Sequence, residues 1–143
     1  MLRFKDEIVA EHMTRTVKTV TRDMTMRELQ AMFAADDFNA YPVRENGHVV
    51  GFVTKLDVLN CFAFSAGGTA PRYDDLMKRT AADVMTPDFI YVSSSTKLTR
   101  VLQLMVEHRI RAIPVIDADQ QLAGIISRED ILRALDRCGH PVQ

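Results

Sequence analysis

The amino-acid sequence predicts an α+β fold built from two tandem repeats, and two observations lead to this prediction. Residues 51–57 read Gly-Phe-Val-Thr-Lys-Leu-Asp and return at residues 124–130 as Gly-Ile-Ile-Ser-Arg-Glu-Asp, at an offset of 124 − 51 = 73. Further upstream, Ala-Tyr-Pro-Val at residues 40–43 matches Ala-Ile-Pro-Val at residues 112–115, at an offset of 112 − 40 = 72. Separated motifs that recur at nearly one offset indicate an internal duplication.

The first repeat reads as strand–helix–strand–strand–helix. Residues 17–20 are extended, and Thr25 then opens a helix, with Glu28 three residues later completing a capping box. Asn46-Gly47 is typical of a tight hairpin turn between the next two strands. The closing helix is predicted from residue 56 to about residue 64.

The second repeat follows the same order of elements. Residues 89–92 form its first strand, a serine turn precedes its first helix, and its closing helix runs from residue 129 to about residue 137. Pro42 in the first repeat and Pro114 in the second lack an amide donor, so each marks an edge or a bulged strand.

We therefore predict a leader at residues 1–12, repeats at 8–64 and 80–137, a connector at 65–79 and a tail at 138–143. The connector contains Gly67-Gly68, which favours a flexible link. Neither half covers its own sheet, so two repeats packed sheet to sheet with pseudo-two-fold symmetry are the expected arrangement.

Composition narrows the class of protein. The chain has 143 residues, of which 47% are apolar and 26% charged, as in an ordinary globular domain. A net charge of −1 argues against a dedicated nucleic-acid binder, and no apolar run is long enough to cross a membrane. The N-terminus lacks a signal-peptide pattern. Cys61 and Cys138 form no paired motif, so a cytoplasmic location is expected.

The repeated turn after the glycine strand carries the chemistry. Thr54 with Asp57, and Ser127 with Asp130, have the spacing of helix caps, each worth roughly 1 kcal/mol. The motif also occurs twice, follows a glycine and is accompanied by a basic residue. A helix N-terminus suits a phosphate, and a neighbouring carboxylate accepts two hydrogen bonds from a vicinal diol such as ribose. Capping and binding are compatible roles.

These motifs resemble a tandem pair of cystathionine-β-synthase (CBS) domains, often called a Bateman module. The resemblance rests on Met13-Thr14 with Met85-Thr86, on the two Ala-x-Pro-Val stretches and on the two glycine–hydroxyl–aspartate turns. It implies a cleft between paired sheets that binds AMP, ADP, ATP, S-adenosylmethionine or sometimes NAD. It also implies that the aspartates hold the ribose, that the hydroxyls contact the ribose–phosphate end and that the backbone before each proline reads the adenine.

The resemblance implies two crossed sites. Carried over residue by residue, the first contains Thr54, Lys55, Asp57, Asp88, Phe89, Ile90, Arg111, Ala112, Ile113 and Pro114. The second contains Ser127, Arg128, Asp130, Thr16, Val17, Lys18, Asn39, Ala40, Tyr41 and Pro42. We expect the first to be the stronger, because Lys18 occupies a position where the family usually has an apolar residue and Asn39 stands in place of Arg111.

The leading hypothesis is therefore a regulatory, energy-sensing module that binds an adenosine-containing ligand and signals to a partner protein. The alternative is a constitutive dimerisation or scaffold module without a physiological ligand. An enzyme is not expected, because no catalytic or metal-ligand spacing is visible among His12, His48, His108 and His140. We also expect a homodimer through apolar residues of the closing helices, namely Leu59, Phe62, Phe64, Leu132 and Leu135. No resident cofactor, metal, nucleic acid or membrane is expected.

Overall fold

The computed structural model describes residues 3–63 and 73–139. The chain forms two compact units: unit 1 joins Met1–Val17 to Ile90–Gln143, and unit 2 is Lys18–Phe89. Each unit contains a small two-stranded antiparallel sheet and several helices. The prediction of a mixed helix-and-strand fold with one small sheet in each half is thus confirmed.

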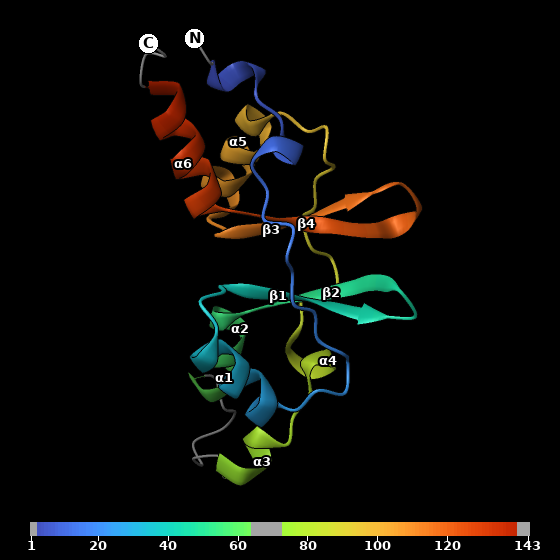
Figure 1. Cartoon of the computed structure of the whole chain (residues 1–143). Helices are drawn as coiled ribbons and strands as arrows, with labels where there is room; N and C mark the ends of the chain where they lie inside the picture. Colours follow the sequence, from blue (N-terminus) through green and yellow to red (C-terminus); the bar gives the residue numbers. More distant parts are fainter. Residues whose placement is uncertain (1–2, 64–72, 140–143) are drawn as a thin grey trace. The chain divides into compact units, whose positions relative to one another are not determined.

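Unit 2 contains one hairpin with its helices. The elements are α1 (Met26–Ala35), β1 (Ala40–Glu45), β2 (His48–Thr54), α2 (Lys55–Ala63), α3 (Tyr73–Met77) and α4 (Ala81–Val84). Strand β1 pairs with β2 in a register that places Ala40 opposite Thr54. Helices α1 and α2 lie on the same side of this hairpin (Figure 1). The unit is therefore a two-layer arrangement of helices on a sheet.

Unit 1 repeats this design with three additional short 3-10 turns. The elements are η1 (Phe4–Asp6), η2 (Val9–Glu11), α5 (Leu98–His108), β3 (Ala112–Asp117), η3 (Ala118–Gln120), β4 (Gln121–Ser127) and α6 (Arg128–Gly139). Strands β3 and β4 pair with Ala112 opposite Ser127, and α5 and α6 both lie on one side of them (Figure 1).

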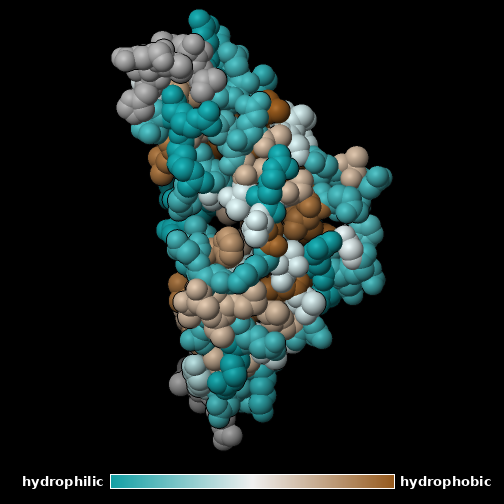
Figure 2. All heavy atoms as spheres, viewed as in Figure 1, coloured by the Kyte–Doolittle hydropathy of each residue, from teal (hydrophilic) through white to brown (hydrophobic). Residues whose placement is uncertain are grey.

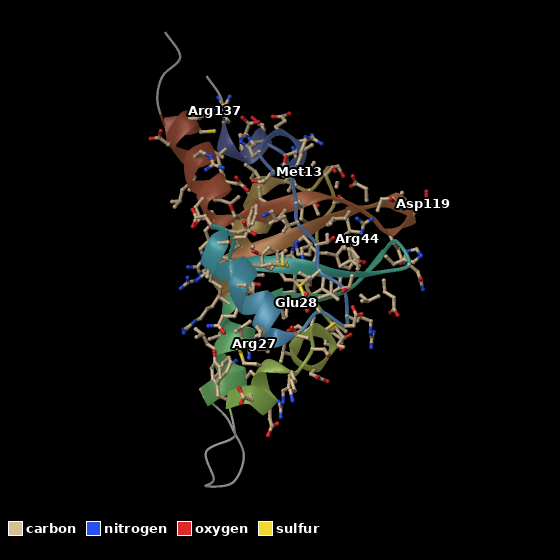
Figure 3. All side chains as sticks on the ribbon, turned by 60° about the horizontal axis from the view of Figure 1, so that its bottom comes forward. Met13, Arg27, Glu28, Arg44, Asp119 and Arg137 are labelled. Atoms are coloured by element: carbon tan, nitrogen blue, oxygen red, sulfur yellow. The ribbon has the colours of Figure 1, made fainter. Side chains whose placement is uncertain are left out.

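Local sequence signals account for several of these elements. The Thr25 hydroxyl accepts a hydrogen bond from the Glu28 amide at 3.2 Å, and the Thr25 amide donates to the Glu28 side chain at 3.3 Å, which confirms the predicted capping box. Asn46 and Gly47 have φ values of 52° and 80°, as a tight turn with two left-handed residues requires. In the other hairpin, Asp119 lies near the tip of the turn (Figure 3) with φ of 64°.

The first strand predicted in each repeat is very short in the structure. The expected strand at 17–20 is reduced to a single parallel bridge, in which the Val20 amide donates to the Pro42 carbonyl at 3.0 Å and the Arg44 amide donates to the Val20 carbonyl at 2.9 Å. The preceding rung would need an amide hydrogen on Pro42, and proline has none. The backbone at Lys18 therefore runs beside a strand that offers it no donor.

The expected strand at 89–92 is shortened in the same way. It keeps one bridge, at Val92, whose amide donates to the Pro114 carbonyl at 3.2 Å. A register shift follows each proline, between Val43 and Arg44 and between Val115 and Ile116, which confirms the expected bulges.

Each unit combines the body of one repeat with the leading segment of the other. In unit 1, the Val9 amide donates to the Thr96 carbonyl at 2.9 Å, and Thr14 bridges Ile125 of β4. In unit 2, Thr86 forms the equivalent antiparallel bridge to Phe52 of β2. The leader expected at residues 1–12 is therefore held by the second repeat, and the segment entering the second repeat is held by the first.

The apolar side chains of each unit form its core. In unit 1, buried residues from η2, α5, both strands and α6 pack together, among them Val9, Leu98, Ile113 and Ile126. In unit 2, Tyr41 is fully buried against Phe33 and Phe38. The face shown in Figure 2 is mostly hydrophilic over the described residues. Within them, no helix is both long and apolar enough for a membrane crossing.

Candidate functional site

The turn that follows each glycine strand is a reciprocal cap. The Thr54 amide donates to Asp57 Oδ2 at 2.8 Å, and the Asp57 amide donates to the Thr54 hydroxyl at 3.1 Å. The second copy repeats this, with Ser127 to Asp130 Oδ2 at 2.9 Å and Asp130 to the Ser127 hydroxyl at 3.2 Å. The capping role is confirmed, and it points one carboxylate in each unit toward the start of a helix.

The two carboxylates nevertheless differ in whether an oxygen is left to accept a hydrogen bond from an external ligand. Asp130 is only 1% exposed. The Thr14 hydroxyl lies 3.3 Å from each of its oxygens, and the Arg133 guanidinium, one turn later on α6, is paired with Oδ1. Both oxygens of Asp130 are thus engaged within unit 1. This is how the structure satisfies a buried charge, which is costly to leave unpaired.

Asp57 is half-buried and lacks both of these partners. The residue equivalent to Thr14 is Thr86, which is exposed, and the residue equivalent to Arg133 is Asn60. Among the described residues, the Asp57 carboxylate bonds only to its own cap, through Oδ2. Oδ1 of Asp57 therefore remains available to accept a hydrogen bond, whereas Asp130 would have to exchange one partner for another.

The repeated glycine permits a close approach of the chain to itself. A Cβ on Gly124 would lie 2.5 Å from the Thr14 carbonyl oxygen, and one on Gly51 would lie 2.9 Å from Cγ of Met85. Both neighbours belong to the repeated Met-Thr motif. The two motifs that mark the repeat are thus in contact within each unit, and together they set the position of the capped turn.

The remaining predicted residues of unit 2 divide into exposed and engaged groups. The Asn39 carbonyl accepts a hydrogen bond from the Lys55 amide at 3.1 Å, which ties the start of β1 to the start of α2. Tyr41 is fully buried, so it offers a ligand only its backbone. Pro42 is also buried, whereas Asp88 is exposed. Phe89 is partly buried, with its ring 6.3 Å from that of Phe52.

A polar chain beside β1 was not foreseen from the sequence. The Lys18 ammonium donates to Asp36 at 2.8 Å, and the Tyr41 hydroxyl donates to the other oxygen of Asp36 at 2.9 Å. The Lys18 bond and then the Tyr41 bond lower the pKa of Asp36. Burial, together with the bond to Asp36, raises the pKa of Tyr41. Asp36 thus holds the ammonium of Lys18, the residue that we expect to weaken the second site.

The predicted residues of unit 1 show the matching arrangement. The Arg111 carbonyl accepts from the Arg128 amide at 3.0 Å, while the Arg111 side chain is exposed. The Arg128 guanidinium donates to the Ile110 carbonyl at 3.3 Å. Ile90 is partly buried against the core. The other predicted residues of this unit are Ala112, Ile113 and Pro114, which are buried, Val17, which is partly buried, and Thr16, which is exposed.

Each predicted site takes residues from both units, so the structure describes it as two separate halves. Sequence reasoning missed Thr14 and Arg133 as partners of Asp130. The signals were present, because Thr14 lies in the repeated Met-Thr motif and Arg133 stands three residues after Asp130 on a helix, where side chains meet.

Comparison with known proteins identifies the class. The CBS domain model matches residues 8–63 and 81–137, so the chain belongs to the CBS domain family and carries two copies of the domain. The protein MJ0188 of Methanocaldococcus jannaschii is 27% identical over 126 residues, which cover 88% of this chain and 43% of that protein. The chain spans less than half the length of the first relatives that it matches.

Solved structures of this family share the fold. Protein MJ1225 of Methanocaldococcus jannaschii superposes with a TM-score of 0.82 at 22% identity, covering 92% of this chain and 48% of that one. The CBS domain pair of MJ0100, solved with 5′-methylthioadenosine and S-adenosyl-L-methionine, superposes with a TM-score of 0.77 at 21% identity. This match covers 92% of this chain and 97% of that one. CBSX2 of Arabidopsis thaliana, solved in complex with AMP, superposes with a TM-score of 0.77 at 24% identity, covering 93% of this chain and 98% of that one. CBS domain pairs are generally regulatory modules rather than catalysts.

Proposed function

We propose that this chain is a regulatory module that binds an adenosine-containing ligand in a cleft between its two sheets and signals by a change of conformation or of dimer geometry. The observation that carries the proposal is the capped aspartate of unit 2, whose Oδ1 has no partner among the described residues. Structural relatives in complex with AMP and with S-adenosyl-L-methionine support this ligand class.

Asp57 is the proposed ribose-binding residue. Its Oδ2 is fixed by the Thr54 amide, so the carboxylate is held in one orientation before a ligand arrives. A vicinal diol can then donate to Oδ1, and preorganisation of this kind lowers the cost of binding. The positive end of the helix dipole at the start of α2, together with Lys55, favours a phosphate at the same end.

The other half of this proposed site comes from unit 1. Arg111 has an exposed guanidinium, which suits phosphate oxygens, and Ile90 offers apolar surface for an adenine. The backbone around Ala112 and Ile113, next to Pro114, is proposed to contact the edge of the adenine. With Asp88 and Phe89 these residues complete the site.

The site built on Asp130 is proposed to be the weaker one. Thr14 and Arg133 already occupy the carboxylate, and Lys18 is held by Asp36. A ribose would have to displace a bond from a buried acid, which costs about 1–3 kcal/mol. Its proposed contacts are Ser127, Arg128, Thr16, Val17, Asn39, Ala40, Tyr41 and Pro42, with the last two engaged through the backbone.

A ligand panel read by thermal unfolding tests the proposal. AMP, ADP, ATP, S-adenosylmethionine and NAD should include at least one compound that raises the melting temperature, because binding to the folded state stabilises it by mass action. GMP is the control for the base. Asp57→Ala should remove most of the shift and Asp130→Ala little of it. No change in melting temperature with any compound of the panel would favour the alternative, a scaffold without a physiological ligand.

We further propose a homodimer formed through the closing helices. Leu59 is 62% exposed on α2 and its repeat equivalent Leu132 is 64% exposed on α6; Leu56 and Leu135 extend the two apolar strips. Phe62 is partly buried against Tyr73, with rings 5.9 Å apart, and contributes less than expected. Phe64 lies outside the described residues. Sedimentation should show a dimer that Leu59→Glu or Leu132→Glu converts to monomer; a monomeric wild type would contradict the proposal.

The proposed setting is the cytoplasm, where Cys61 and Cys138, both free thiols, would stay reduced. The partner that receives the signal is proposed to be another protein or another domain, because the relatives extend well beyond the matched region.

A further inference from the structure

The leader in unit 1 contains a compact group of three side chains of types that can bind a metal ion, and the nucleotide proposal does not use them. Glu7, Glu11 and His12 each present one ligand atom, and these three atoms lie within 4.8 Å of one another. They come from η2 and the residues on either side of it. Acidic groups gather on many protein surfaces without binding a metal. The burial and hydrogen bonding of these three side chains therefore decide whether they are a candidate metal site.

Two of the three side chains are buried. Those of Glu7 and His12 are 9% and 6% exposed, and His12 Nε2 lies 3.7 Å from Glu7 Oε1, beyond hydrogen-bond distance. Among the described residues, His12 Nε2 is the buried side-chain atom that has no hydrogen-bond partner. A buried polar nitrogen is costly to leave unsatisfied. This nitrogen faces carboxylate oxygens, which are ligands rather than donors when ionised.

The second repeat shows that this arrangement is not required by the fold. At the offset of 72, Glu7 corresponds to Arg79 and His12 to Val84, while Glu11 keeps an acidic equivalent in Asp83. Val84 packs in the core of unit 2 as an apolar residue should. Where one copy fills the position with valine, the other therefore places a histidine with an unsatisfied nitrogen and adds a buried glutamate beside it.

We propose that Glu7, Glu11 and His12 form a binding site for a divalent transition-metal ion of the zinc type, with water as the fourth ligand. One imidazole and two carboxylates are a ligand set that suits such ions. Tetrahedral bonds of about 2.0–2.1 Å separate neighbouring ligands by about 3.3 Å. The observed 3.7 Å between His12 Nε2 and Glu7 Oε1 needs only a small closing movement.

The surroundings hold this site in place and include one positive charge. The Glu7 carbonyl accepts from the Leu98 amide at 3.0 Å, so the segment that bears the ligands also caps the start of α5. Arg137, labelled on α6 in Figure 3, is a positive charge that acts on Glu11. Because all three ligands belong to residues 7–12, a bound metal would fix the conformation of the leader itself.

Calorimetric titration of the full chain with Zn²⁺, after treatment with a chelator, tests the site. We expect one ion per chain, and Co²⁺ should give the absorption bands of a tetrahedral complex, which nonspecific surface binding does not produce. Mg²⁺ and Ca²⁺ should not compete at similar concentrations, because they prefer all-oxygen sites.

Matched variants decide which residues bind. His12→Val copies the residue of the second repeat and should abolish the cobalt bands. Glu11→Gln, at an exposed position, should weaken zinc binding by more than the roughly 10–100-fold that loss of an outer-shell partner costs. His48→Ala removes an exposed histidine elsewhere and should bind as the wild type does. Unchanged zinc affinity in a folded His12→Val variant, or no zinc binding by the wild type, would overturn the proposal.

Discussion

Alanine substitution of the two repeated glycines should reduce stability by different amounts, although the positions are equivalent in sequence. A Cβ at Gly124 would lie 2.5 Å from the Thr14 carbonyl oxygen, where ordinary contact begins at 3.4 Å. The segment around Thr14 would have to retreat by about 3.4 − 2.5 = 0.9 Å. At Gly51 the two closest atoms are Sδ and Cγ of Met85, which can rotate aside, and Cβ of Met85, at 3.2 Å, has to shift by only a few tenths of an ångström.

The cost at Gly124 follows from the bonds that this retreat would lengthen. The Thr14 amide donates to the Ile125 carbonyl at 2.8 Å, and the Ile125 amide donates to the Thr14 carbonyl at 2.9 Å. Each bond is worth about 0.5–1.5 kcal/mol, and alanine returns about 0.4–1 kcal/mol by restricting the unfolded chain. Gly124→Ala should therefore destabilise by about 1–2 kcal/mol, and Gly51→Ala should stay within about 1 kcal/mol of the wild type.

Urea unfolding followed by circular dichroism measures both variants against the wild type, with equal slopes as the check that the unfolded states are comparable. If Gly51→Ala loses as much stability as Gly124→Ala, the distinction between a rigid backbone neighbour and a flexible side chain is refuted.

Two further predictions concern hydrogen bonds within unit 1. Thr14→Val removes one of the three donors to the buried Asp130 and should cost about 1–3 kcal/mol, while Thr86→Val, at the exposed equivalent, should change stability by less than about 0.5 kcal/mol; equal effects would contradict the assigned asymmetry. Ser94 donates to Asp117 through its hydroxyl at 2.5 Å and its amide at 2.8 Å, and these bonds lower the pKa of Asp117 below 3.8. The stability that they contribute is present above the unfolded-state pKa and is lost as the pH falls through the lowered folded-state value. In Ser94→Ala the pKa of Asp117, followed by NMR, should rise toward 3.8, and an unchanged value would contradict this cause.

Much of the fold could be predicted because its signals lie in short stretches of the sequence. The capping box at Thr25, the Asn46-Gly47 turn and the reciprocal caps at Asp57 and Asp130 depend on residues close in sequence, and the structure contains all of them. The family resemblance was likewise confirmed, because its motifs are spaced along nearly the whole chain.

The errors arise where distant segments decide the outcome. Pro42 and Pro114 were read as bulge markers, but their effect on the neighbouring parallel segments, which lose a rung, was not anticipated. The exchange of leading segments between the halves was missed because no local pattern says which sheet Thr14 or Thr86 will join.

The candidate site shows the same limit. Asp57 and Asp130 occupy equivalent positions in sequence, yet only Asp130 accepts a hydrogen bond from Thr14, which lies 116 residues away. His12 was assigned no role, because the three residues of the proposed metal group look like an ordinary polar leader until η2 folds and buries two of them.

The central claim is that Asp57 binds the ribose of an adenosine ligand, and calorimetry with AMP and 2′-deoxy-AMP tests it most directly. Asp57→Asn is the informative variant, since its carbonyl can still accept from the Thr54 amide while the second oxygen is lost. We predict that the wild type prefers AMP over its 2′-deoxy form by tenfold or more, as one lost bond to a charged group implies at about 1.4 kcal/mol per tenfold. Asp57→Asn should lose both that preference and most of the affinity. Equal affinity of the wild type for the two nucleotides, or unchanged binding of AMP by Asp57→Asn, would contradict the claim.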